Sequence, residues 1–188
     1  MTVIEEKKTL RAEIRAAERA LASADKQAAD AAIIKNVMST DEYASAELIF
    51  AYVGTAREID TRPLLAALLR AGKRLCVPRC IGDGIMELRE ISSLDVLVPG
   101  SFGILEPPQS CPLVGEDAVE LALVPCLSCD HAGARLGQGG GFYDRFAEKY
   151  SGASFLLCRE ALTRDNIPTQ AHDARFPVVI TDAGVFRN

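Results

Sequence analysis

Five glycines fall within nine residues of this chain, at positions 133, 137, 139, 140 and 141. An apolar run over residues 121–125 precedes them, and a helix-like stretch over residues 142–150 follows. A glycine-rich turn ahead of a helix can direct several backbone N–H groups at one point, where the helix dipole adds partial positive charge. This segment therefore predicts a phosphate-binding loop, although a purely structural turn with glycines at positive φ would leave the same pattern.

Apolar runs alternate with amphipathic segments along the rest of the chain. Apolar residues at helical spacing predict a helix over residues 5–22 and, after a break with a new N-cap at residues 23–26, a second helix that ends at about residue 38. Short apolar runs predict strands over residues 48–53, 74–79, 86–90, 120–125, 154–158 and 177–181. A leucine-rich helix between the first two strands makes a βαβ unit, whose strands should be parallel. We therefore predict an α/β fold, with residues 1–188 forming a single three-layer α/β/α domain around a mostly parallel sheet.

Charge and hydropathy exclude several classes of function. The net charge of -5 and pI of about 5.1 argue against general nucleic-acid binding. No apolar stretch approaches the roughly 18 residues that a membrane span needs, and the charged start has no signal-peptide core. Six cysteines are scattered through a chain with a substantial core, which favours reduced thiols and a cytoplasmic setting. We expect a monomer whose partners are small molecules.

The common nucleotide-binding signatures are absent. The segment at Gly72 and Lys73 lacks the upstream glycine and the downstream Ser or Thr of a P-loop. Gly137 and Gly139 fail the dinucleotide fingerprint, because Phe142 holds the third glycine position. A phosphate site here must therefore be of another kind.

Charged residues on either side of the glycine stretch extend the phosphate hypothesis. Asp144 falls in the first turn of the following helix, where it could stabilise that helix or hold a cation against a phosphate. Asp173, after His172, supplies a second carboxylate or lies in an ordinary polar loop. Lys7 and Arg11 are basic groups near a helix start, either on a solvated face or facing an anion.

Two further features leave alternatives open. Glu58 follows the first strand, where loops of a parallel sheet line the ligand crevice, or it is a solvated loop acid. Cys126 and Cys129, with His131 beyond, resemble part of a zinc or redox site. No second Cys/His pair follows at finger spacing, so packed or loop thiols are the favoured interpretation.

Taken together, these segments resemble the 5-formyltetrahydrofolate cyclo-ligase family, also called 5,10-methenyltetrahydrofolate synthetase. The matching segments run nearly from end to end: residues 7–11, Tyr52, 58–61, 72–74, 77–79, 99–107, 135–144, 172–173 and 178–181. The glycine segment is the most specific of them. The sequence departs from the family at Phe142, where a tyrosine is expected, at Gln138, and at Cys126 and Cys129.

The resemblance implies a cyclisation of 5-formyltetrahydrofolate to 5,10-methenyltetrahydrofolate that consumes ATP with Mg²⁺ as the cofactor. It places the nucleotide on Lys7, Arg11, Arg135, Leu136, Gly137, Gln138, Gly139, Gly140, Gly141, Phe142 and Tyr143. It places the folate on Tyr52, Glu58, Phe142 and Tyr143, and Mg²⁺ on Asp144 and Asp173. Two alternatives remain, namely a sugar-phosphate isomerase-like enzyme of the same architecture and a folate- or nucleotide-binding module without turnover.

Overall fold

The computed structural model describes residues 2–188 apart from the side chain of Phe102. The first residue of the expected domain 1–188, and that side chain in the segment 99–107, lie outside the described residues. Over the described range, eight strands form one sheet in the order β12-β11-β10-β7-β1-β2-β3-β6. Their bounds are β1 Leu48–Ala51, β2 Arg74–Gly82, β3 Ile85–Ile91, β6 Leu113–Val114, β7 Leu121–Pro125, β10 Ala153–Leu157, β11 Val178–Thr181 and β12 Gly184–Arg187.

The centre of the sheet is parallel and its margins are antiparallel. Strands β11, β10, β7, β1 and β2 run in one direction, and Pro125 at the end of β7 pairs with Leu157 at the end of β10. The expected strand 86–90 lies within β3, which pairs antiparallel with β2 because a tight turn at Gly84, with φ of +70°, joins them. The prediction of a mostly parallel sheet with a parallel βαβ unit is confirmed.

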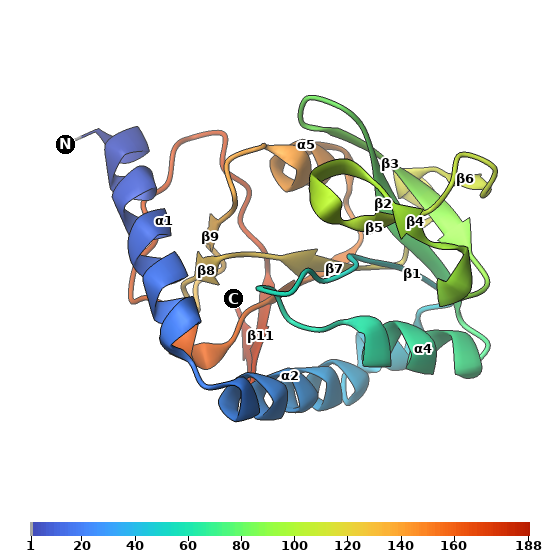
Figure 1. Ribbon diagram of the computed structural model, residues 1–188, viewed down its shortest axis with the longest axis horizontal. Helices are drawn as coiled ribbons and strands as arrows, with labels where there is room; N and C mark the ends of the chain where they lie inside the picture. Colours follow the sequence, from blue (N-terminus) through green and yellow to red (C-terminus); the bar gives the residue numbers. More distant parts are fainter. Residues whose placement is uncertain (1) are drawn as a thin grey trace.

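Helices cover both faces of this sheet, so the three-layer prediction is also confirmed (Figure 1). Helix α2 (Ser23–Met38) and α4 (Arg62–Arg70) pack on one face, and α1 (Val3–Ala20) and α5 (Phe142–Lys149) on the other. Successive side chains of a strand point to opposite faces of the sheet, so each face has its own hydrophobic core. Ile49 packs in the core on the side of α2 and α4, and Phe50 packs in the core on the side of α1 and α5. Within residues 2–188, no helix combines the length and apolar character needed to cross a bilayer.

Several short elements were not predicted. Helix α3 (Asp41–Ser45) is one, and the segment 92–118 holds the paired strands β4 (Val98–Pro99) and β5 (Leu105–Glu106) together with 3-10 turns. Strands β8 (Ser128–Cys129) and β9 (Arg135–Leu136) pair antiparallel and lead into the glycines. This hairpin returns the chain after β7 toward the carboxyl edge of the sheet, where α5 begins.

Candidate functional site

A cavity of about 940 Å³ lies at the carboxyl ends of the central strands. Tyr52 follows β1 and Pro125 ends β7, and both line the cavity wall. Ligands of open parallel sheets bind in the crevice outside these strand ends. Every residue expected at the site lines this cavity. They are Lys7, Arg11, Tyr52, Glu58, Arg135, Leu136, Gly137, Gln138, Gly139, Gly140, Gly141, Phe142, Tyr143, Asp144 and Asp173. Segments far apart in the sequence therefore meet around one space.

The glycine loop, residues 137–141, forms one wall of the cavity between β9 and α5. Gly139 and Gly141 have φ values of +104° and +70°, which side-chain-bearing residues rarely adopt. Among residues 2–188, no hydrogen-bond acceptor is paired with the backbone N–H of Gly139, Gly140 or Gly141. Gly141 is also the N-cap of α5, so these open donors coincide with the positive end of the helix dipole. The loop is therefore suited to an anion.

Helix α1 holds this loop with two arginines. The Arg11 Nε donates to the Gly137 carbonyl at 2.8 Å, and the Arg15 Nη2 donates to the Gln138 Oε1 at 2.9 Å. Burial and the charges of Arg15 and Arg135 lower the pKa of Arg11, although the guanidinium stays charged. Arg15 was not predicted as a site residue, although its position four residues after Arg11 places both on one face of the helix. An anion in the cavity would relieve the mutual repulsion of these cations.

A buried ion pair joins the two ends of the chain beside the loop. Lys7, with 8 % of its surface exposed, forms a salt bridge with Asp173. Burial disfavours the charged carboxylate, but hydrogen bonds from Lys7 and the Gln170 backbone, with the charges of Lys7 and His172, hold the pKa of Asp173 below its ordinary value. Lys8, next to Lys7 in the sequence, is exposed. Helical geometry thus selects which basic residue faces the cavity.

Arg135 and Asp144 form a second ion pair on the wall of the same cavity. The Arg135 Nη2 donates to the Asp144 Oδ2 at 2.9 Å, and its Nη1 donates to the Pro125 carbonyl at 3.3 Å. The guanidinium carbon also lies 5.6 Å from the centre of the Tyr143 ring, a cation–π distance. Within the described part of the chain, the Arg135 Nε is the one buried side-chain polar atom without a hydrogen-bond partner. Arg135 thus ties β7, β9 and α5 together.

The aromatic end of the cavity carries two phenols and one carboxylate. Burial, with a further contribution from the Glu58 charge, raises the pKa of both Tyr52 and Tyr143 above the ordinary value. Both hydroxyls therefore keep their protons near neutral pH and can donate hydrogen bonds. The Glu58 Oε2 accepts a hydrogen bond from the Thr55 backbone N–H at 3.0 Å. This wall offers apolar area together with a few polar groups, as small-molecule sites do.

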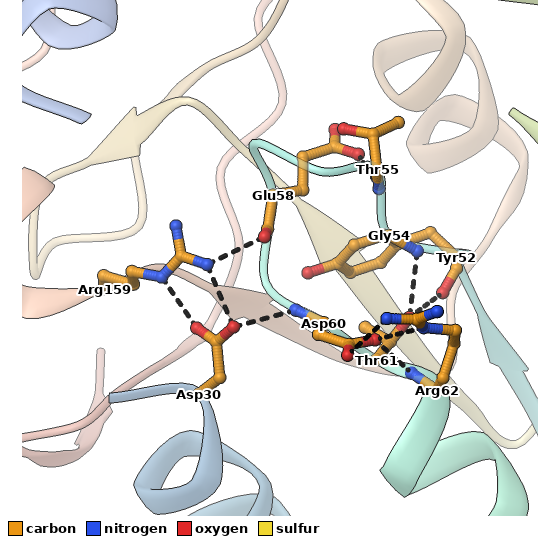
Figure 2. A network of polar contacts seen from close by, with 9 residues as sticks. All are labelled: Asp30, Tyr52, Gly54, Thr55, Glu58, Asp60, Thr61, Arg62 and Arg159. Atoms are coloured by element: carbon orange, nitrogen blue, oxygen red, sulfur yellow. Dashed lines mark hydrogen bonds and ion pairs between the residues drawn. The ribbon is translucent and has the colours of Figure 1, made fainter. Parts of the chain in front are cut away.

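A buried network fixes the loop that presents Glu58 (Figure 2). The Arg159 Nε and Nη2 donate to the two carboxylate oxygens of Asp30 at 2.7 and 2.9 Å. The Arg159 Nη2 also donates to the Glu58 carbonyl at 2.8 Å, and the second Asp30 oxygen accepts from the Asp60 backbone N–H at 2.9 Å. Asp30 and Arg159 were not predicted to belong to the site, because no local sequence pattern shows that α2 and the end of β10 lie close together.

Two of the carboxylates on the cavity wall are chemically of the kind that binds hard cations. Asp144 and Asp173 offer the oxygen ligands that Mg²⁺ prefers, and their side chains are 25 % and 10 % exposed. Each is neutralised by a cationic side chain, Arg135 or Lys7. The cavity wall therefore includes the Asp144 and Asp173 carboxylates, backbone donors without an acceptor among the described residues, and several basic groups, which are chemically suited to an anion such as a polyphosphate.

Comparisons with known proteins give one family. The sequence model of the 5-formyltetrahydrofolate cyclo-ligase family matches residues 3–182. The 5-formyltetrahydrofolate cyclo-ligase of Mycolicibacterium smegmatis is 33 % identical over 73 % of this chain and 74 % of its own length. A probable 5-formyltetrahydrofolate cyclo-ligase of Schizosaccharomyces pombe is 27 % identical over 83 % and 85 %. The structure of Aquifex aeolicus 5,10-methenyltetrahydrofolate synthetase superimposes with a TM-score of 0.87 and 27 % identity, covering 96 % of this chain and 92 % of that one.

Proposed function

The chain belongs to the 5-formyltetrahydrofolate cyclo-ligase family, and from that membership we propose that its cavity binds MgATP beside 5-formyltetrahydrofolate and closes the folate to 5,10-methenyltetrahydrofolate. The chain is an enzyme of the cyclo-ligase kind, as its relatives in several species are named. One observation carries the proposal for the site. Gly139 to Gly141, whose amides have no acceptor among residues 2–188, line the same cavity as Lys7, Arg11 and Glu58.

The reaction needs activation of an unreactive group. A formamide carbon is a poor electrophile, and its oxygen is a poor leaving group. Transfer of the γ-phosphoryl group from ATP to the formyl oxygen releases ADP and leaves an iminium-like phosphate. The N10 nitrogen then attacks the formyl carbon and loses its proton, and the carbon–oxygen bond breaks as inorganic phosphate departs. Phosphoryl transfer depends mainly on positioning and charge neutralisation, so this route requires no protein nucleophile.

The residues divide into three roles. Lys7, Arg11 and the amides of the glycine loop would bind the ATP phosphates, and Arg135 would hold this end of the site rigid. Asp144 and Asp173 would hold Mg²⁺, which supplies neutralisation of phosphate charge. Tyr52, Glu58, Phe142 and Tyr143, which line the aromatic end of the cavity, would bind the folate.

Replacement of Asp144 by alanine tests the proposal. We expect the rise in methenyl-folate absorbance, in a mixture of ATP, Mg²⁺ and 5-formyltetrahydrofolate, to fall by about 100-fold or more, since one preorganised electrostatic group is worth about that much. Circular dichroism should show an intact fold. Asp165→Ala, which removes an exposed carboxylate away from the cavity, is the matched control.

Three results would contradict the proposal. Unchanged activity in Asp144→Ala would remove the metal assignment. Tight binding of ATP and folate by the wild-type protein without any absorbance change would favour a binding module. ATP consumption that does not depend on 5-formyltetrahydrofolate would point to a different enzyme of the same architecture.

A further inference from the structure

Three cysteines meet beside the cavity, although only two of them are close in the sequence. Cys126 follows β7, Cys129 lies in β8, and Cys158 follows β10. Because Pro125 and Leu157 are register partners in adjacent parallel strands, the residues that follow them emerge side by side. The β8–β9 hairpin brings the third thiol back to the same place. The three sulfur atoms lie within 4.8 Å of one another.

The cluster is well shielded but not closed. Cys129 and Cys158 are 0 % and 2 % exposed, whereas Cys126 is partly exposed. Cys126 and Cys158 line a smaller cavity of about 220 Å³, between α1 and the Glu58 loop. Cys126 also lines the larger cavity. An ion could therefore reach the thiols without unfolding of the core.

The spacing suits a metal ion that binds sulfur. Thiolates about 2.3 Å from one tetrahedral ion stand about 3.8 Å apart, so the three sulfurs would need to move together by roughly 1 Å at most. Soft thiolate ligands select Zn²⁺ and Cu⁺ over Mg²⁺, which prefers oxygen. A disulfide would join two of the thiols and leave the third unpaired, whereas one metal ion can be coordinated by all three.

The coordination sphere would have an open position. In the described part of the chain, no fourth His, Cys, Asp or Glu belongs to the cluster. The smaller cavity leaves room for a water molecule or another small ligand at that position. The Arg135 guanidinium donates to the carbonyl of Pro125, the residue before Cys126, and so places positive charge near an anionic metal–thiolate group.

We propose that Cys126, Cys129 and Cys158 form a binding site for one thiophilic d10 cation, Zn²⁺ or Cu⁺, distinct from the carboxylate site proposed for Mg²⁺. Such an ion would join the ends of β7, β8 and β10 at the edge of the sheet that carries the larger cavity. Binding to the folded state alone would raise the midpoint of thermal unfolding.

Cobalt titration of the full-length, fully reduced and metal-free protein tests this site without reference to activity. We expect one equivalent of Co²⁺ to produce a thiolate-to-cobalt charge-transfer band in the near ultraviolet, and one equivalent of Zn²⁺ to abolish it. A parallel titration with Cu⁺ against a chromogenic chelator distinguishes the two ions. Cys129→Ser should weaken binding at least about tenfold, or 1.4 kcal/mol. Cys111→Ser, which alters a thiol outside the cluster, should bind as the wild type does.

The proposal fails if no charge-transfer band appears and Cu⁺ does not bind in the parallel titration, or if Cys129→Ser retains the wild-type affinity. Should the serine variants not fold, alkylation of the wild-type protein decides the question. Zn²⁺ or Cu⁺ should then protect Cys126 from iodoacetamide, as peptide mass spectrometry reports, while Cys111 reacts unchanged. Equal alkylation of Cys126 with and without the ions would overturn the site.

Discussion

Replacement of Arg159 by methionine should reveal how much the buried network beneath the Glu58 loop contributes to the free energy of unfolding. The Arg159 and Asp30 side chains are only 5 % and 10 % exposed, and two hydrogen bonds of 2.7 and 2.9 Å join them. Burial lowers the pKa of Arg159, but hydrogen bonds and charge from Asp30 outweigh this and raise it. Methionine fills similar volume and leaves the Asp30 carboxylate without its cation. Removal of one partner of a buried pair costs about 3–5 kcal/mol in the free energy of unfolding.

An exposed ion pair where the same loop meets α4 provides the control. Arg62 and Asp60 are also joined by two side-chain hydrogen bonds of 2.8 Å, but their side chains are 66 % and 43 % exposed (Figure 2). Arg62→Met should cost at most about 1 kcal/mol, because water screens such pairs. With a slope of about 2–3 kcal/mol per molar urea, Arg159→Met should lower the unfolding midpoint by roughly 1–2 M. Circular dichroism against urea concentration measures both shifts.

A double variant separates the charge from the packing. Asp30→Asn keeps an acceptor for the Asp60 backbone N–H, so the double variant Asp30→Asn with Arg159→Met should be more stable than Arg159→Met alone.

Arg159→Met should also affect substrate binding, because Arg159 donates to the Glu58 carbonyl. We expect the KM for 5-formyltetrahydrofolate in this variant to rise about tenfold, or 1.4 kcal/mol, with little change in the KM for ATP. If Arg159→Met and Arg62→Met unfold at the same urea concentration, or if the effects of the two buried substitutions simply add, the buried pair does not have the stabilising role described here.

Two other perturbations address the phosphate end of the cavity. Because the folded-state pKa of Asp173 is held below its ordinary value of 3.8, its ion pair with Lys7 should stabilise the protein above about pH 4 and lose that effect as the pH falls. Asp173→Asn should therefore cost stability at pH 7 and little at pH 3 in urea unfolding, and an equal cost at both values would contradict this account. Gly139→Ala should raise the KM for ATP, because φ of +104° strains a side-chain-bearing residue by about 1–2 kcal/mol in the loop that faces the phosphates. Gly72→Ala is the control, because Gly72 has φ of +75° but lies away from the cavity. This variant should unfold slightly more easily and keep the wild-type KM for ATP. An equal rise of the KM for ATP in both variants would show that backbone strain alone is responsible.

Sequence periodicity predicted most of the secondary structure for a physical reason. Buried strands such as β1 and β7 are nearly continuous apolar runs, and helices such as α4 repeat leucines at 3.6-residue spacing. The short strands of the segment 92–118 were not predicted, because a strand of two residues is too short to show an alternation of apolar and polar side chains. Thr61 is the N-cap residue of α4, but its hydroxyl donates to the Tyr52 carbonyl and accepts no hydrogen bond from an α4 amide, a tertiary contact that local residue spacing does not encode.

The amino-acid sequence alone determined the alternating α/β architecture, the glycine loop ahead of a helix and the identity of the residues that flank this loop in the sequence. These are local properties, set by side-chain spacing and by the backbone freedom of glycine. Only the tertiary structure decided which distant groups meet: Lys7 with Asp173, Asp30 with Arg159, and Cys158 with Cys126 and Cys129. Such contacts depend on the register of parallel strands and on which face each helix buries, and no short stretch of sequence encodes either.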